Sequence, residues 1–330
     1  MEAPDSFINH HMLKLVDKNS RAFLMGISIL WIIAFHYCYY SALLSNSALK
    51  FLFGRGYLGV DIFMFLSAYG LCHSYVRNGA LKFYGRRAQR IFPMYLVFLL
   101  VVLTIYGSNY EDSPWLLFFY QITGLAVFRQ VDVEWFIPAL ICLYVTFPLI
   151  FKGVKFIYGK APLAIPVIVI GLSLAATPLS KVMLAGFPQR FGIIIVGVAT
   201  YMALEDSNEK YLWLLYSSIA MAAVIFSFSE ALTGSMLIPL ILLGLSSIRI
   251  GHSPFFKQIS FAGKHSLEIY LAQSLALNHY FLHDNGPFVT KCLISLAIIV
   301  IAAFVFYLLH DGTWKLVAQM RKSSQRNISH

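Results

Sequence analysis

The sequence predicts an all-α fold, a polytopic transmembrane helix bundle of about ten spans with both termini in the cytoplasm. The chain has 330 residues, of which 59% are hydrophobic and only 12% are charged, and its mean hydropathy is +0.71. Soluble domains carry about 25% charged residues, so the composition excludes a soluble globular protein. Long apolar runs recur along the whole chain, which is typical of an integral membrane protein.

Charge and cysteine usage narrow the possible partners. A net charge of +10 could suggest nucleic acid, but cytoplasmic Lys and Arg explain it more simply in a membrane protein. We therefore expect the lipid bilayer as a partner and no nucleic acid. The four cysteines all fall within apolar runs, so they predict neither a disulfide framework nor a metal site.

Ten apolar runs are long enough to span a bilayer. They cover residues 22–44, 57–76, 91–107, 135–151, 162–179, 191–204, 211–228, 231–248, 266–283 and 289–309. An eleventh run, 115–128, has only 14 residues, which suits a re-entrant or interfacial segment. If this run does not cross, 19 of the 25 Lys and Arg residues lie on the cytoplasmic side, as the positive-inside rule favours.

This topology predicts three parts of the chain. Residues 1–21 form a cytoplasmic N-terminal segment without a signal-peptide cleavage site. Residues 22–309 form the transmembrane domain, and residues 310–330 form a basic, disordered cytoplasmic tail. Because the loops are short, any chemistry must lie among the helices or at their ends.

His36 lies well inside the first apolar run, where an ionisable side chain is costly and suggests function by default. A lone histidine in a helix is also commonly a packed, hydrogen-bonded residue. Asp61 begins the second span, and a short connection predicts that the two helices are antiparallel neighbours, with both side chains at a similar depth. Asp61 could then orient His36 as a general base. Alternatively, Asp61 only caps the N-terminus of its helix.

A basic cluster of Arg86, Arg87 and Arg90 follows on the cytoplasmic side. Such clusters commonly serve topology or bind anionic lipid. Arg86 and Arg90 are four residues apart, so they share a helix face and could clamp a phosphate. A helix N-terminus at the cluster would add a favourable dipole for an anion.

Polar residues also stand at the predicted outer ends of later spans. Glu134 and Trp135 open the fourth span and Arg190 opens the sixth, where an acceptor could reach them, although Trp and Arg are common interfacial anchors. His279 and His283 have a spacing that permits zinc. No third or fourth ligand is evident from the sequence, so we predict no metal.

Six segments, taken together and in this order, resemble the acyltransferase 3 family of integral membrane acyltransferases. Each is a weak motif, but six in register make a strong signal that covers nearly the whole chain, from the first to the ninth span. The segments are MGISILWIIAFHY, GVDIFMFLSAYG, FYGRRAQRIFPMY, EWFIPALICLYVTFP, RFGIIIVGV and GKHSLEIYL.

The resemblance implies a ten-helix bundle that moves an acyl group, often acetyl, from a cytoplasmic acyl-CoA such as acetyl-CoA. The implied acceptor is a hydroxyl of a cell-surface or exported glycan or glycolipid, and the implied location is a bacterial inner membrane. The family's first-helix histidine falls on His36 and its second-helix aspartate on Asp61, which predicts these two as catalytic residues.

The family's arginine motif falls on the basic cluster, which would hold the phosphates of the donor. Its mid-chain Trp and Tyr fall on Trp135 and Tyr144. With Glu134 and Arg190, these residues make up the predicted acceptor site.

Two positions depart from the family pattern. The family commonly has a basic residue eleven positions before the histidine, and that position here is Met25. Arg21 lies one helical turn nearer the cytoplasm, and its long side chain could reach part of the gap, so we include it in the donor site. Where a histidine often follows IYL in the family, this chain has Gln273.

Three other functions would use the same polar residues differently. A transporter or flippase would use them for binding or proton transfer, but such proteins usually show repeats and broken helices, which the sequence lacks. A membrane acyltransferase of another class would rely on His279. A lipid-binding scaffold would need none of these residues.

Overall fold

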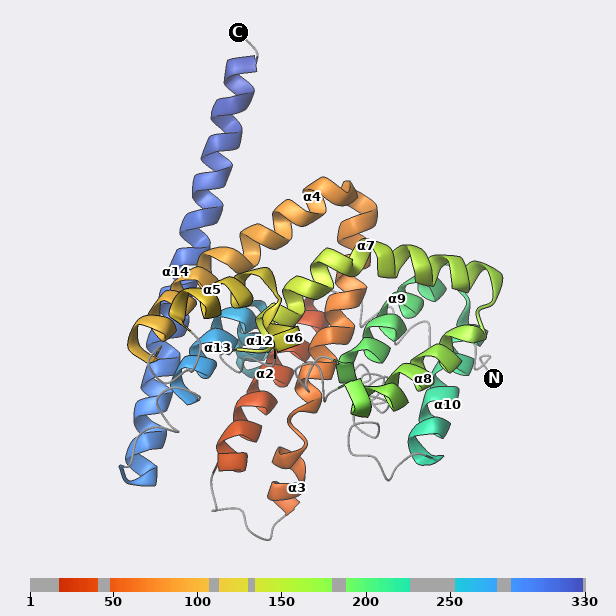
Figure 1. Cartoon of the computed structure of the whole chain (residues 1–330), viewed down its shortest axis with the longest axis horizontal. Coiled ribbons are helices and arrows are strands. Elements are labelled where there is room, and N and C mark those ends of the chain that lie inside the picture. Colours follow the sequence, from red (N-terminus) through yellow and green to blue (C-terminus); the bar gives the residue numbers. More distant parts are fainter. Residues whose placement is uncertain are drawn as a thin grey trace. The chain divides into compact units, whose positions relative to one another are not determined.

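The computed structural model describes residues 18–40, 48–106, 113–129, 134–179, 188–225, 253–277 and 286–328 (Figure 1). Nearly all of these residues are helical and no strand occurs among them, as the sequence predicts. The chain divides into two compact units. The first unit comprises Met1–Gly79 and Gly124–Ser266, and the second comprises Ala80–Thr123 and Leu267–His330.

The first unit contains most of the helices. They are α2 (Lys18–Tyr40), α3 (Ala48–Gly54), the first part of α4 (Leu58–Tyr106), α6 (Ala126–Arg129), α7 (Phe136–Lys160), α8 (Ala164–Leu179), the 3-10 helix η3 (Pro188–Arg190), α9 (Phe191–Glu205), α10 (Glu209–Ile225) and α12 (Pro254–Lys264). The second unit contains the rest of α4, α5 (Pro114–Thr123), nearly all of α13 (Ser266–Ser274) and α14 (Phe288–Ile328).

Gly79 interrupts the long helix α4, which covers two of the predicted spans. Its backbone has φ 69° and ψ 171°, a conformation that glycine adopts without the steric cost of a side chain. The helix resumes at residue 80 and passes through Pro93 without another non-helical residue. Gly79 is also where the first unit ends along α4.

Gly59 and Gly70 of α4, and Gly56 in the turn before it, let α4 approach α2 closely, as small residues do between membrane helices. A side chain at any of these positions would meet α2 directly. Gly56 opposes Phe35, Gly59 opposes Ile32, and Gly70 opposes Arg21. Rising numbers on α4 match falling numbers on α2, which confirms that the two helices are antiparallel neighbours.

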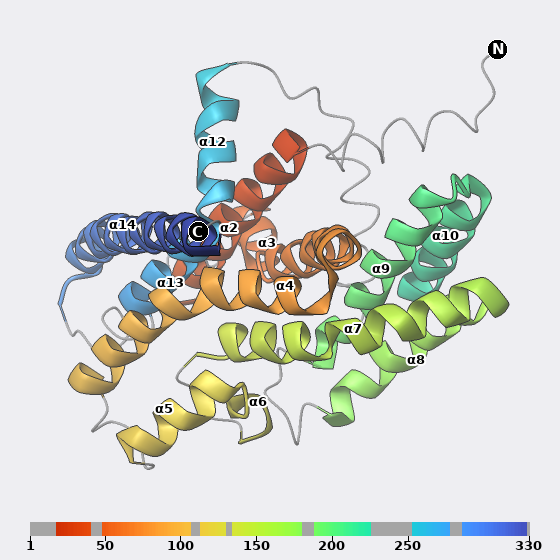
Figure 2. The ribbon, with the colours of Figure 1, turned by 90° about the horizontal axis from the view of Figure 1, so that it is seen from above.

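Helix α12 packs along α2 in the same manner, as Figure 2 shows. A Cβ at Gly26 would overlap Ile259 of α12, and a Cβ at Gly263 would overlap the backbone of Ala22. Residues far apart in the sequence are thereby held at backbone contact distance in the first unit.

Four helices of the described residues are long and apolar enough to cross a membrane: α2, α4, α7 and α14. Two shorter apolar helices, α8 and α9, also coincide with predicted spans. Exposed apolar side chains such as Leu293, Val300 and Phe304 cover α14, which is the surface expected in lipid. The chain is an integral membrane protein; the count of ten spans and the cytoplasmic termini stay predictions.

Several predicted segments can be compared with the structure only in part. The run at 115–128 forms α5 and α6, of ten and four residues. Ten helical residues extend about 15 Å, half of a bilayer core, which agrees with a segment that does not cross. The predicted span 231–248, the end of the span 266–283 and the histidines His279 and His283 lie outside the described residues.

The predicted disorder of the basic tail is wrong, because α14 continues as far as Ile328. No proline follows its start, and Gly312 is the only glycine within it. Lys315 Nζ lies 2.6 Å from Asp311 Oδ2, an i,i+4 ion pair that supports an exposed helix.

Candidate active site

His36 lies near the end of α2, half-buried, in the first unit. Its ring centroid is 5.3 Å from that of Phe35. It stands one helical turn beyond Ile32, the residue that opposes Gly59 of α4. The histidine is therefore placed at the end of α2 where α4 begins.

Asp61 lies in the first turn of α4 and is fully enclosed by the first unit. Its Oδ1 atom is 3.1 Å from Nε of Arg190, and the two side chains are only 3% and 6% exposed. Arg190 ends η3 and stands at the N-cap of α9. A buried pair of this kind makes each charge dependent on the other, since removing one leaves the other uncompensated.

The expected contact between Asp61 and His36 is replaced in this structure by the ion pair with Arg190. The helix register gives the reason. Gly59 of α4 lies against Ile32 of α2, and the two helices are antiparallel. Asp61 is two residues beyond Gly59 on α4, and His36 is four residues beyond Ile32 on α2, so the two residues lie on opposite sides of this contact. Six residues of helix correspond to an offset of about 9 Å, so the similar depth predicted for the two residues is wrong. Asp61 lies in the first turn of α4, where the helix dipole favours a negative charge, and its Oδ1 faces Arg190.

Trp135 joins the same cluster from the start of α7. The guanidinium carbon of Arg190 lies 5.5 Å from the centre of a Trp135 ring, within the range of cation–π attraction. Asp61, Trp135 and Arg190, which we call the Arg190 cluster, thus bring together one predicted catalytic residue and two predicted acceptor residues. Segments of α4, α7 and η3 supply them.

The other two predicted acceptor residues have different surroundings. Glu134 is buried, and its Oε1 accepts a hydrogen bond of 3.1 Å from the backbone N–H of Phe136, at the start of α7. Tyr144 is half-buried and lies nine residues along α7 from Trp135, about 13 Å at the helical rise. The structure therefore does not bring Tyr144 into the Arg190 cluster.

The three arginines of the basic cluster belong to the second unit. Arg86 is exposed, and the Arg87 guanidinium carbon lies 5.7 Å from the centre of the Phe83 ring. Because this part of α4 begins at residue 80, the arginines lie about two turns inside the helix. The helix N-terminus expected at the cluster is therefore not there, and an anion at the arginines would be held by side chains.

A carboxylate–imidazole pair in the second unit was not expected from the sequence. His310 Nδ1 lies 2.6 Å from Oε1 of Glu268, whose side chain is 2% exposed. The charge of Arg90 also acts on Glu268. Glu268 sits in α13 and His310 in α14, far apart in the sequence, and no local spacing could have paired them.

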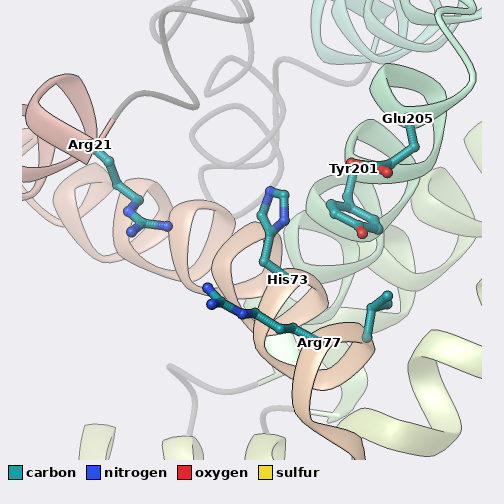
Figure 3. A pocket seen from close by; sticks show the side chains of 6 residues that line it. Arg21, His73, Arg77, Tyr201 and Glu205 are labelled. Carbon is teal, nitrogen blue, oxygen red and sulfur yellow. The ribbon is translucent and has the colours of Figure 1, made fainter.

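The cytoplasmic side predicted for the first unit carries an open pocket of about 440 Å³ (Figure 3). Arg21 of α2, which we predicted to take part in donor binding, contributes to its wall. The remaining lining residues are His73, Val76 and Arg77 of α4, and Tyr201 and Glu205 of α9. None of these five was predicted to be a site residue.

The fold and the Arg190 cluster define a helical integral membrane protein with a charged group buried in its bundle. A family model described as an acyltransferase domain matches residues 23–310. The match covers most of the chain and all of the predicted site residues except Arg21, so the chain belongs to the acyltransferase 3 family and is a membrane acyltransferase. No curated protein and no solved structure matches the chain.

Proposed function

We propose that the protein transfers an acyl group, with acetyl the first choice, from cytoplasmic acyl-CoA to a hydroxyl of a cell-surface or exported glycan or glycolipid. The observation that carries the proposal is the family match over residues 23–310. His36, which the resemblance in sequence indicates as the catalytic histidine, lies within this range, near the end of the long apolar helix α2. A bacterial inner membrane is the location that fits such an acceptor.

His36 is the proposed general base. One imidazole nitrogen takes the proton of the acceptor hydroxyl while the oxygen attacks the thioester carbonyl. The C–S bond then breaks, CoA leaves as a thiolate, and the proton held by His36 returns to it. The products are an O-acyl ester and CoA with a free thiol. A transient acyl-histidine is the less favoured variant.

Charged groups would position the two substrates. Arg86, Arg87, Arg90 and Arg21 are the proposed anchors for the donor phosphates, because arginine forms charge-assisted, bidentate hydrogen bonds with phosphate. The Arg190 cluster is the proposed acceptor site, with Glu134 and Tyr144 nearby along the chain. Asp61 acts there through Arg190, whose guanidinium it holds in place over Trp135.

The decisive variant is His36→Ala. The purified full-length protein would be supplied with acetyl-CoA and a glycolipid extract, and release of free CoA thiol would be measured. We expect the variant to lose at least about 100-fold in rate, the usual contribution of a general base, while its elution and Tm stay those of the wild type. His265→Ala, a half-buried histidine of the same unit that lies against Phe261, is the matched control. Full activity of His36→Ala would refute the mechanism.

The same assay separates the enzyme from its main rival. A transporter or flippase would release no CoA thiol from acetyl-CoA under any condition. Loss of activity in a His279→Ala variant together with full activity of His36→Ala would indicate the other acyltransferase class.

A further inference from the structure

The pocket of the first unit has a strongly uneven charge distribution. Figure 3 shows Arg21 and Arg77 reaching toward one side of the pocket, and Tyr201 and Glu205 on the other, with His73 between them. Arg77 is exposed and Arg21 is half-buried. Two guanidinium groups that share one pocket repel each other unless an anion lies between them, so this side is suited to a phosphate.

The backbone gives Arg21 a defined place in the pocket. A Cβ added at Gly70 would lie 3.2 Å from Nη1 of Arg21, so the guanidinium extends over a glycine of α4. The glycine leaves room for the arginine to cross from α2 to the pocket wall. This arrangement brings cations from two helices to the same opening.

The opposite wall is aromatic and acidic. The ring centroid of His73 lies 4.8 Å from that of Tyr201 and 5.2 Å from that of Tyr69, and both arrangements are edge-to-face. The charges of Glu205 and Arg21 both act on the His73 ring. Aromatic faces stack on nucleobases whatever their sequence, and a carboxylate accepts hydrogen bonds from an exocyclic amino group such as that of adenine.

We propose that this pocket binds the 3′-phosphoadenosine end of the acyl-CoA donor, which extends the function proposed above. Arg21 and Arg77 hold the 3′-phosphate, and the exposed His73 ring stacks on the adenine. Tyr201, which lies edge-to-face with His73, contacts the edge of the base, and Glu205 accepts a hydrogen bond from its amino group. The volume of about 440 Å³ lies in the lower part of the range of about 300–1,000 Å³ found for small-molecule sites. A pocket of this volume suits one end of the donor.

The first test measures binding, so it needs neither acceptor nor turnover. Purified full-length protein would be titrated calorimetrically with adenosine 3′,5′-bisphosphate and with AMP, which lacks the 3′-phosphate. We expect the bisphosphate to bind at least tenfold more tightly than AMP. Arg77→Gln, at an exposed position, should remove this tenfold preference, since a charged hydrogen bond is lost. Lys155→Gln, an exposed cation of α7 in the same unit, should leave it unchanged.

The second test concerns the acidic wall. The wild type should prefer the adenine nucleotide over inosine 3′,5′-bisphosphate about tenfold, because the hypoxanthine oxygen would face the Glu205 carboxylate. Glu205→Gln should equalise the two, since its amide can donate as well as accept. If Glu205→Gln keeps the preference for the adenine nucleotide, the adenine does not bind against Glu205.

The outcomes distinguish the pocket from the reaction. Equal binding of bisphosphate by wild type and Arg77→Gln overturns the proposal while acyl transfer stands. Binding of bisphosphate without any thiol release in the presence of acetyl-CoA supports the pocket and counts against the proposed function. Bicelles containing phosphatidylglycerol test whether the pocket binds the phosphate of a lipid headgroup instead of that of a nucleotide. If they bind in an Arg77-dependent manner and the nucleotide does not, the pocket is a lipid headgroup site and the nucleotide proposal fails.

Discussion

At the residue scale, the buried ion pair of Asp61 and Arg190 changes how the candidate site is understood. Both residues can be found from the sequence, because each is a charge at the end of an apolar run. Their pairing cannot be found from the sequence, because 129 positions separate them and one sequence carries no information on which distant residues meet. The same holds for Glu268 and His310, whose contact joins α13 to α14.

Neutralising Asp61 should destabilise the protein strongly. Asp61→Asn removes the carboxylate charge that lies 3.1 Å from the buried Arg190 guanidinium, and breaking a buried pair typically costs about 3–5 kcal/mol. The measurement is the Tm and the free energy of unfolding of the detergent-solubilised protein. Asp311→Asn, which removes an exposed i,i+4 pair, is the matched control and should cost less than about 1 kcal/mol.

A double variant sharpens this test. Asp61→Asn combined with Arg190→Gln removes both charges, so it should recover part of the loss seen in Asp61→Asn alone. Strictly additive losses in the double variant would show that the two side chains do not interact in the folded protein.

At the element scale, glycines mark the places where α4 and α12 lie closest to α2. Gly59 and the preceding turn residue Gly56 set the register of α4 on α2, and Gly26 and Gly263 set that of α12 on α2. The apolar runs predicted α2, α7, α8 and α9 because long apolar segments must form helices in lipid. The break at Gly79 could not be predicted, because an isolated glycine is tolerated within a helix.

Gly263→Ala should weaken the packing of α12 on α2. The added methyl group would overlap the backbone of Ala22, which cannot rotate away as a side chain can, and overpacking typically costs about 1–3 kcal/mol. Thermal unfolding would measure the loss. Gly153→Ala on α7, where nothing lies within 4 Å of the new Cβ, should be neutral or stabilise by up to about 1 kcal/mol. Equal stabilities for the two variants would contradict the close contact.

At the scale of the whole molecule, the predicted orientation in the membrane is based on the distribution of charge. Of the 25 Lys and Arg residues, 19 fall on the predicted cytoplasmic side, including those after the last span. Among the described residues, four helices are long and apolar enough to cross a membrane.

Reporter fusions would check this orientation. Alkaline phosphatase fused after Lys160 or at the C-terminus should be inactive, because both positions are predicted to be cytoplasmic, whereas a fusion after Lys181 should be active. A fluorescent protein at the C-terminus should fluoresce. Phosphatase activity at the C-terminus would rule out an even number of spans with a cytoplasmic N-terminus.

The ion pair between Asp61 and Arg190 has a consequence for how the protein is made. Asp61 leaves the ribosome 129 residues before Arg190, and at about 5–20 residues per second this delay lasts roughly 6–26 seconds. During that interval α4 has to enter the bilayer with its carboxylate unmatched, protonated or kept at the interface. The ion pair can therefore form only after η3 has been synthesised, and the N-terminal part of the first unit stays without this contact until then.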